Sequence, residues 1–299
     1  MNKDLACVIP AVVTALNPDN SFDSTGMRKL VRYIVDSGMK TLFILGFMGE
    51  GLTFSREQRR EIIRTAREEG GEDVSIITGV FDNATELILQ HARDAEESGA
   101  NYVLTTPTDF YPLRDHELEQ LFTDIADQSP LPLIIYNCPL NSHYVSGDLI
   151  GRLSHHPNIA GVKQTSDLLK LEQMQLAAGN REDFIILSGE EFNYLASMTM
   201  EIEGFMLGGP GNVFPNKCLR IYENYQEGRI KEAHTEYQNM INFLFELYAL
   251  PMDETAAIKG ILEISGICGR WMRKPIISVT DDEIRAIETL MAKYQITLD

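Results

Sequence analysis

Short apolar runs alternate along the chain with amphipathic stretches of helical spacing. Thr41–Leu45 is one such run, and its mixture of β-branched and aliphatic residues predicts a buried strand. The stretch Ser24–Ser37 has apolar residues at helical spacing and precedes Gly38, so it predicts a helix that ends at this glycine. The Ser55 hydroxyl can accept a backbone N–H hydrogen bond, which predicts the start of a helix over Arg56–Glu69.

The alternation continues until eight strand–helix units are complete, shortly before Asn216. Further helices are expected up to about Ser98 and from about Asp115 to Asp127. Eight apolar strands that alternate with amphipathic helices predict a (β/α)8 TIM barrel, whose active site lies at the carboxyl ends of the strands. The predicted strands are part of Ala6–Leu16, then Thr41–Leu45, Val74–Val80, Asn101–Thr105, Leu131–Tyr136, Ile159–Lys163, Phe184–Leu187 and Gly204–Leu207.

The last part of the chain is predicted to be helical. From Cys218 onward the apolar positions follow the helical period, with breaks near Pro251 and Pro275. No Gly/Ser-rich linker precedes this part. We therefore expect a single compact unit, in which residues 1–215 form the barrel and residues 216–299 form a C-terminal helical extension packed on it.

Charge and hydropathy narrow the classes of function. The 299 residues include 26 basic and 44 acidic side chains, and the net charge of −18 disfavours binding to the phosphate backbone of nucleic acids. No apolar stretch approaches the roughly 20 residues that span a bilayer, and the start of the chain has no signal-peptide pattern. We expect a cytoplasmic protein with neither a nucleic-acid partner nor a membrane partner.

The cysteines give no sign of a metal centre. They are far apart and form no C-x-x-C pair: Cys7, Cys138, Cys218 and Cys268. This spacing indicates neither a zinc site nor a disulfide framework. Reduced and mostly buried thiols, and no metal, are therefore expected.

Two reactive side chains end successive predicted strands. Tyr136 closes the run Leu131–Tyr136, and Lys163 closes the run Ile159–Lys163. Burial disfavours the ammonium form and can lower a lysine pKa from about 10.4 toward roughly 7–8, and a neutral amine can attack a ketone. A lone lysine at a strand end more often packs its stem on the strand and extends its ammonium to solvent. The pair therefore predicts a Schiff-base site only together with further motifs.

A glycine-rich loop follows the second predicted strand. Gly46 and Gly49 allow backbone N–H groups to approach an anionic ligand. The loop lacks the G-x-G-x-x-G spacing of a dinucleotide site, and alone it is more often a tight strand–helix connection. Glu50, which follows the loop, is either a buried structural acid or a helix-capping charge.

Four motifs together resemble one family over almost the whole chain. They follow the second, fifth, sixth and seventh predicted strands, where a barrel places its active site. The combination is similar to that of the dihydrodipicolinate synthase and N-acetylneuraminate lyase family of pyruvate-dependent class I aldolases. The motifs are Gly46-x-x-Gly49-Glu50, Tyr136-Asn137-x-Pro139, Gly161-Val162-Lys163 and Ser188-Gly189.

The resemblance implies a Schiff base between Lys163 and the keto carbon of pyruvate or another 2-keto acid, with Tyr136 as proton shuttle. No cofactor is implied besides the covalent imine. A protonated imine withdraws electrons from the adjacent carbon, so a carbon–carbon bond can form or break through an enamine. By the same resemblance, Glu190 and Glu191 match acidic positions that contact polyhydroxy substrates in some lyases, although a solvated helix start is an equally good interpretation of both. The residues expected around the substrate are Gly46, Phe47, Met48, Gly49, Asn141, Thr165, Gly189, Glu190 and Met206.

The chain departs from the family pattern at three places. Many members carry two hydroxyl residues where this chain has Phe47 and Met48, and those hydroxyls bind the carboxylate or relay protons to the tyrosine. The synthases carry an arginine two residues after the proline of the tyrosine motif, where this chain has Asn141. The second tyrosine that the synthases carry after a proline is absent after Pro107, although Tyr111 follows slightly later.

The sequence therefore predicts a lyase that makes or cleaves a 2-keto acid with pyruvate as one component. The departures favour a 2-keto-3-deoxy sugar acid or a related substrate. One alternative is 4-hydroxy-tetrahydrodipicolinate synthase, which joins pyruvate to aspartate semialdehyde. Another is a family member that binds a keto acid without turnover. The resemblance also implies a homotetramer built from two dimers, with Tyr111 near a subunit boundary.

Overall fold

Eight parallel strands alternate with helices along the chain and form one sheet, as the sequence predicts for a (β/α)8 barrel. Strands β2 to β8 are neighbours in chain order, and β1 lies beside β8. The strands are short and almost entirely buried, because a parallel sheet is covered on both faces. Their bounds are β1 Val8–Pro10, β2 Thr41–Ile44, β3 Ser75–Gly79, β4 Tyr102–Thr105, β5 Leu133–Asn137, β6 Ile159–Gln164, β7 Ile185–Ser188 and β8 Gly204–Leu207.

The computed structural model describes residues 4–107, 111–138, 143–179 and 181–298. The chain divides into two compact units, each built from three separate segments. Unit 1 consists of Met1–Ile9, Lys40–Phe43 and Ser75–Leu207, and it holds almost the whole sheet. Unit 2 consists of Pro10–Met39, Ile44–Val74 and Gly208–Asp299.

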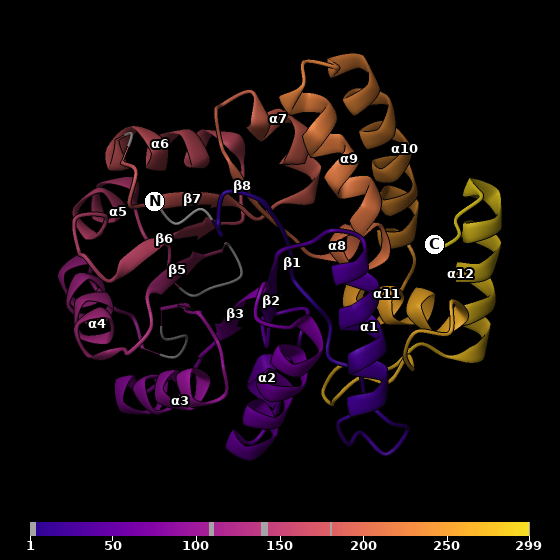
Figure 1. Cartoon of the computed structure of the whole chain (residues 1–299), viewed down its shortest axis with the longest axis horizontal. Helices are drawn as coiled ribbons and strands as arrows, with labels where there is room; N and C mark the ends of the chain where they lie inside the picture. The colour runs from indigo at the N-terminus through magenta and orange to yellow at the C-terminus, as the bar shows by residue number, and fades with distance from the viewer. Residues whose placement is uncertain (1–3, 108–110, 139–142, 180, 299) are drawn as a thin grey trace. The chain divides into compact units, whose positions relative to one another are not determined.

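Four helices of unit 1 follow strands β3 to β6 and lie along the outside of those strands (Figure 1). Among them, α5 packs against α6 and α3 packs against α4. A shorter helix and a 3-10 turn connect β7 to β8. These elements are α3 Thr85–Glu97, α4 Asp115–Gln128, α5 Gly147–Leu153, α6 Leu168–Ala178, η2 Glu191–Asn193 and α7 Tyr194–Met198.

The first two helices of the chain belong to unit 2 and pack against each other. Helix α1, Ser24–Asp36, buries the apolar face that the sequence predicts, and Gly38 follows it with a φ of 103°. Helix α2, Arg56–Gly70, begins with the predicted Ser55 cap, whose hydroxyl accepts the Gln58 N–H at 3.3 Å. The Gln58 side chain in turn accepts the Ser55 N–H, so both ends of the capping box are made.

The C-terminal part of unit 2 is helical, as predicted, and two of its breaks contain the predicted Pro251 and Pro275. A further break, between Gln226 and Ile230, was not predicted. Helix α10 packs against α9 and α12, and α11 packs against α8 and α12. Within the described residues, no helix combines the length and the hydropathy that a bilayer span requires. The remaining elements are η1 Gly51–Thr53, α8 Gly209–Val213, α9 Pro215–Gln226, α10 Ile230–Tyr248, α11 Glu254–Ile264 and α12 Asp281–Tyr294.

The first strand is shorter than the apolar run Ala6–Leu16 suggests, because a side chain takes over the pairing. Only Val8–Pro10 is a strand. Beyond it, the Asn212 side chain donates to the Ala11 carbonyl at 2.8 Å and accepts the Val13 N–H at 3.0 Å. Asn212 is fully buried, so this amide satisfies backbone groups that a neighbouring strand would otherwise pair.

Candidate active site

Lys163 and Tyr136 are partners in the register of two neighbouring strands. β5 and β6 run parallel, and Tyr136 lies opposite Lys163 at their carboxyl ends. The Lys163 Nζ lies 4.1 Å from the centroid of the Tyr136 ring and 5.5 Å from the centroid of the Phe43 ring, which β2 supplies. Two aromatic rings, one from β2 and one from β5, therefore lie beside the amine that β6 carries.

Two glycines make room for the lysine and its strand. A Cβ at Gly161 would lie 2.2 Å from the Ile185 carbonyl oxygen, so only glycine lets β6 approach β7 here. A Cβ at Gly189 would lie 2.7 Å from the Lys163 Cε and 2.2 Å from the Thr165 Oγ1. Any side chain at position 189 would therefore displace the lysine stem or the threonine hydroxyl.

Burial controls the charge of the Lys163 amine. The side chain is 5% exposed, and this burial lowers the pKa of Lys163 to about 8. The Cys138 side chain and the carboxylates of Glu191 and Glu190 act in the opposite direction and raise the pKa. A substantial fraction of the amine is thus neutral near physiological pH, which is the form that attacks a carbonyl carbon.

The Tyr136 phenol keeps its proton across the same pH range. Burial raises the pKa of Tyr136 above its ordinary value, and the neighbouring Cys138 side chain raises it further. The Thr165 hydroxyl is close enough to lower the same pKa, yet its buried Oγ1 makes no hydrogen bond of good geometry in the described part of the chain. A neutral phenol beside a neutral amine can donate and recover a proton.

Asn137 fixes the chain immediately after Tyr136. Its side-chain amide donates to the Val145 carbonyl at 2.8 Å and to the Gln164 side chain at 2.9 Å, and its oxygen accepts the Val145 N–H at 3.0 Å. The residue is fully buried. It therefore connects the ends of β5 and β6 to the segment that precedes α5.

The other residues that the sequence proposes for unit 1 have varied surroundings. Glu190 is half-buried, and its carboxylate accepts the Phe192 N–H at 3.4 Å at the start of η2. Met206 lies in β8 and is fully buried. Tyr111 is 60% exposed, and Asn141 lies outside the described residues.

The predicted anion-binding loop belongs to unit 2 and has a constrained backbone. Leu45 and Glu50 flank it with φ values of 54° and 52°, which non-glycine residues rarely adopt. Gly51 follows, and a Cβ there would lie 1.9 Å from the Leu45 carbonyl oxygen. Among the described residues, the Phe47 and Met48 amides donate to no protein acceptor. Two consecutive N–H groups are thus available to an anion.

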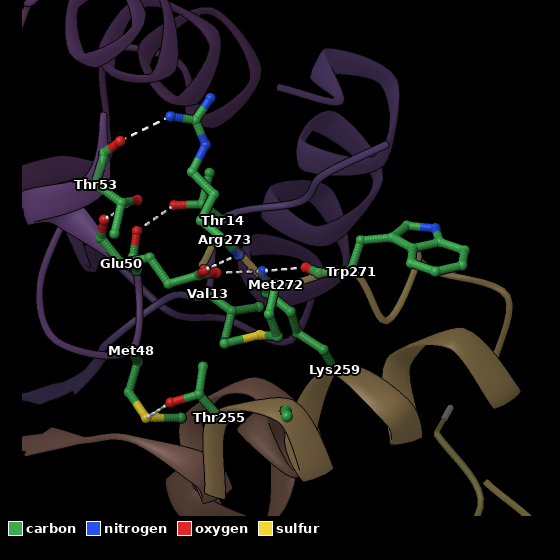
Figure 2. A network of polar contacts seen from close by, with 12 residues as sticks. Val13, Thr14, Met48, Glu50, Thr53, Thr255, Lys259, Trp271, Met272 and Arg273 are labelled. Carbon is green, nitrogen blue, oxygen red and sulfur yellow. Dashed lines mark hydrogen bonds and ion pairs between the residues drawn. The ribbon is translucent and has the colours of Figure 1, made fainter. Parts of the chain in front are cut away.

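Glu50 is a buried structural acid and not a helix-capping charge. It precedes η1 without making a side-chain cap, and its carboxylate forms an ion pair with Lys259 of α11 (Figure 2). Both side chains are completely buried. The same carboxylate accepts the Arg273 N–H at 2.7 Å, and the Lys259 ammonium also donates to the Trp271 carbonyl at 2.8 Å.

Sequence reasoning missed three of these residues. Lys259 is the single charged residue in the stretch Ala256–Leu262, and this isolation in an apolar helix was the available signal. Asn137 belongs to the tyrosine motif, but the sequence alone indicates no role of its own for it. For Cys138 the sequence indicates only a buried thiol, and the structure adds its proximity to Tyr136 and Lys163.

The family follows from the match to a sequence model. Residues 4–294 match the model of the dihydrodipicolinate synthetase family. The chain belongs to this family. The resemblance inferred from the sequence is therefore confirmed.

Relatives within the dihydrodipicolinate synthetase family carry different names. The chain is 29% identical to a 4-hydroxy-tetrahydrodipicolinate synthase of Chlorobium limicola, over 93% of each chain. It is 31% identical to the putative mitochondrial 4-hydroxy-2-oxoglutarate aldolase of Coccidioides immitis, over 75% of this chain and 73% of that one. The dihydrodipicolinate synthase structure from Bacteroides thetaiotaomicron superposes with a TM-score of 0.92 at 23% identity, over 98% and 100% of the two chains, which shows the shared fold.

No metal centre is evident in the described residues. Nowhere in residues 4–107, 111–138, 143–179 and 181–298 do three or more His, Cys, Asp or Glu side chains come together as a possible set of ligands.

Proposed function

We propose that this member of the dihydrodipicolinate synthetase family is a lyase that forms a Schiff base between Lys163 and pyruvate or another 2-keto acid. The observation that carries the proposal is a buried lysine at a strand end whose pKa falls to about 8. The imine replaces a metal or organic cofactor as the electron sink, because its positive nitrogen withdraws electrons from the adjacent carbon. A carbon–carbon bond at that carbon then forms or breaks through the enamine.

We assign the proton transfers of this cycle to Tyr136. Its ring lies against the Lys163 amine, and burial keeps the phenol protonated. The Thr165 hydroxyl and the Cys138 thiol are the neighbours that could supply the relay, since Phe47 and Met48 have no hydroxyl.

We propose that the keto-acid carboxylate binds the loop Gly46–Gly49 through the Phe47 and Met48 amides. The free N–H groups and the family membership support this assignment. Gly189 leaves space at the lysine. Asn141, Thr165, Glu190 and Met206 are our candidates for contact with the rest of the substrate.

The favoured substrate is a 2-keto-3-deoxy sugar acid or a related hydroxylated keto acid. A synthase must hold a second carboxylate, and a charge-assisted hydrogen bond from arginine contributes roughly 1.5–3 kcal/mol, whereas Asn141 is neutral. The aldolase name of the Coccidioides relative is consistent with a hydroxylated keto acid. The synthase reaction is the second candidate, because the Chlorobium synthase aligns over 93% of the chain. Binding without turnover is the third, and the joint presence of Lys163 and Tyr136 argues against it.

Borohydride trapping tests the Schiff base. Incubation with pyruvate and borohydride should add one reduced adduct to Lys163, because an imine is reducible. Intact mass and peptide mapping measure it, and Lys163→Ala serves as the control without the amine. Protein that stays unmodified, or an adduct that survives Lys163→Ala, rejects the Schiff-base assignment.

Replacing Tyr136 with phenylalanine tests the proton shuttle. Tyr136→Phe should lower turnover about 10²- to 10⁴-fold, because it removes the phenol proton while keeping the ring packing. Undiminished turnover in Tyr136→Phe rejects the role of Tyr136 as proton shuttle.

A comparison of kcat/KM tests the substrate. We expect cleavage of at least one member of a 2-keto-3-deoxy sugar acid panel, with pyruvate released. Condensation of pyruvate with aspartate semialdehyde should have a kcat/KM about one to two orders of magnitude lower, because the arginine that would bind the second carboxylate is missing. Efficient condensation together with no cleavage of any panel member would identify a synthase instead.

We also propose a homotetramer of two dimers, located in the cytoplasm. The exposed Tyr111 ring is our candidate for a subunit contact, since large exposed aromatic side chains are enriched in interfaces. Light scattering at micromolar concentration should give four times the chain mass of 33.7 kDa. A stable monomer would reject both the tetramer and the contact role of Tyr111.

A further inference from the structure

Helix α11 contacts the glycine-rich loop of unit 2 at two points. Thr255 and Lys259 are four residues apart and therefore lie on one face of the helix. The Thr255 hydroxyl donates to the Met48 Sδ at 3.4 Å, and the Lys259 ammonium pairs with the Glu50 carboxylate (Figure 2). One face of α11 thus contacts both Met48, whose backbone amide donates to no acceptor among the described residues, and Glu50, which follows the loop.

The polar groups of this contact satisfy one another. The Glu50 carboxylate receives Lys259 on one oxygen and the Arg273 N–H on the other. The Lys259 ammonium reaches the Trp271 carbonyl as well, so the turn after α11 joins the network. From the other side of the loop, the Thr14 hydroxyl donates to the Gly49 carbonyl at 2.7 Å.

A buried ion pair of this kind constrains the positions of its two residues more reliably than it stabilises the fold. Removing two charges from water costs about as much as their attraction returns, so an apolar pair of equal volume often stabilises a protein as well. The pair does, however, fix Glu50, whose left-handed backbone sets the direction in which the chain leaves the loop. Backbone amides bind an anion well only when they are held in place beforehand.

We propose that Lys259 and Thr255 are positioning residues that hold the Phe47 and Met48 amides in the geometry that binds the keto-acid carboxylate. This inference rests on the proposed function, because it assumes that the loop binds that carboxylate. Neither side chain takes part in the chemistry. Their loss should weaken recognition of the carboxylate and leave the ketone chemistry of Lys163 in place.

The test compares two ketones, pyruvate and its methyl ester, of which only pyruvate carries a negative charge. Pyruvate carries the carboxylate, and its methyl ester does not, so the ratio of their half-saturating concentrations in borohydride trapping reports carboxylate recognition. Intact mass separates the two adducts. Lys259→Met should raise the half-saturating concentration of pyruvate about tenfold or more, because small displacements of a binding group are costly. The half-saturating concentration of the methyl ester should change by no more than about twofold. Thr255→Val should have the same selective effect at about two- to fivefold.

Matched controls use the same substitutions elsewhere in unit 2. Lys293→Met removes an exposed lysine whose ammonium pairs with Glu246 at 2.6 Å, and Thr235→Val removes an exposed hydroxyl that donates within α10. Both should leave the ratio unchanged. A general loss of folding would instead impair adduct formation with both ketones alike.

The outcomes separate the inference from the proposed function. A wild-type protein that forms no adduct with either ketone rejects the proposed function. A wild-type adduct with an unchanged ratio in Lys259→Met and Thr255→Val rejects only the positioning role. Circular dichroism monitors folding, and if Lys259→Met does not fold, the ratio in Thr255→Val decides alone.

Discussion

The cost of burying a lysine amine is the constraint on which the candidate site depends. Lys163 is taken out of water at the end of β6, and the lowering of its pKa from 10.5 to about 8 corresponds to about 3 kcal/mol that disfavours the ammonium. The surrounding strands impose this cost through close packing. Gly161 lets β6 approach β7, Gly189 leaves space for the lysine stem, and the Tyr136 and Phe43 rings enclose the amine.

The second buried lysine differs from Lys163 in having a carboxylate partner. Burial lowers the pKa of Lys259 too, but the Glu50 carboxylate contacts its ammonium directly and opposes that shift. Within the described part of the chain, Lys163 has no carboxylate at ion-pair distance, although Glu191 and Glu190 act to raise its pKa. The same desolvation therefore acts on a paired amine in unit 2 and, in unit 1, on an amine that has no carboxylate at ion-pair distance among the described residues.

The sequence predicts the fold well because the relevant signals are local. The bounds of β8 are predicted without error, and the Ser55 cap and the apolar face of α1 follow from nearby residues alone. The candidate lysine and tyrosine also follow from local patterns, since each ends an apolar run. What the sequence does not give is pairing between distant residues. The end of β1 depends on Asn212, and the role of Glu50 depends on Lys259, each about 200 positions away.

The pKa of Lys163, measured in solution, tests the central claim most directly. Lysine labelled with ¹³C at Cε gives an NMR signal that follows protonation, and Lys163→Arg identifies the signal of Lys163. The account predicts a midpoint at about 8 for Lys163, whereas the exposed Lys293, whose pKa the hydrogen bond to Glu246 raises above the ordinary lysine value, should titrate at higher pH in the same sample. A Lys163 midpoint at the value of an exposed lysine would contradict the account, because the amine would then be charged at neutral pH and unable to initiate the reaction.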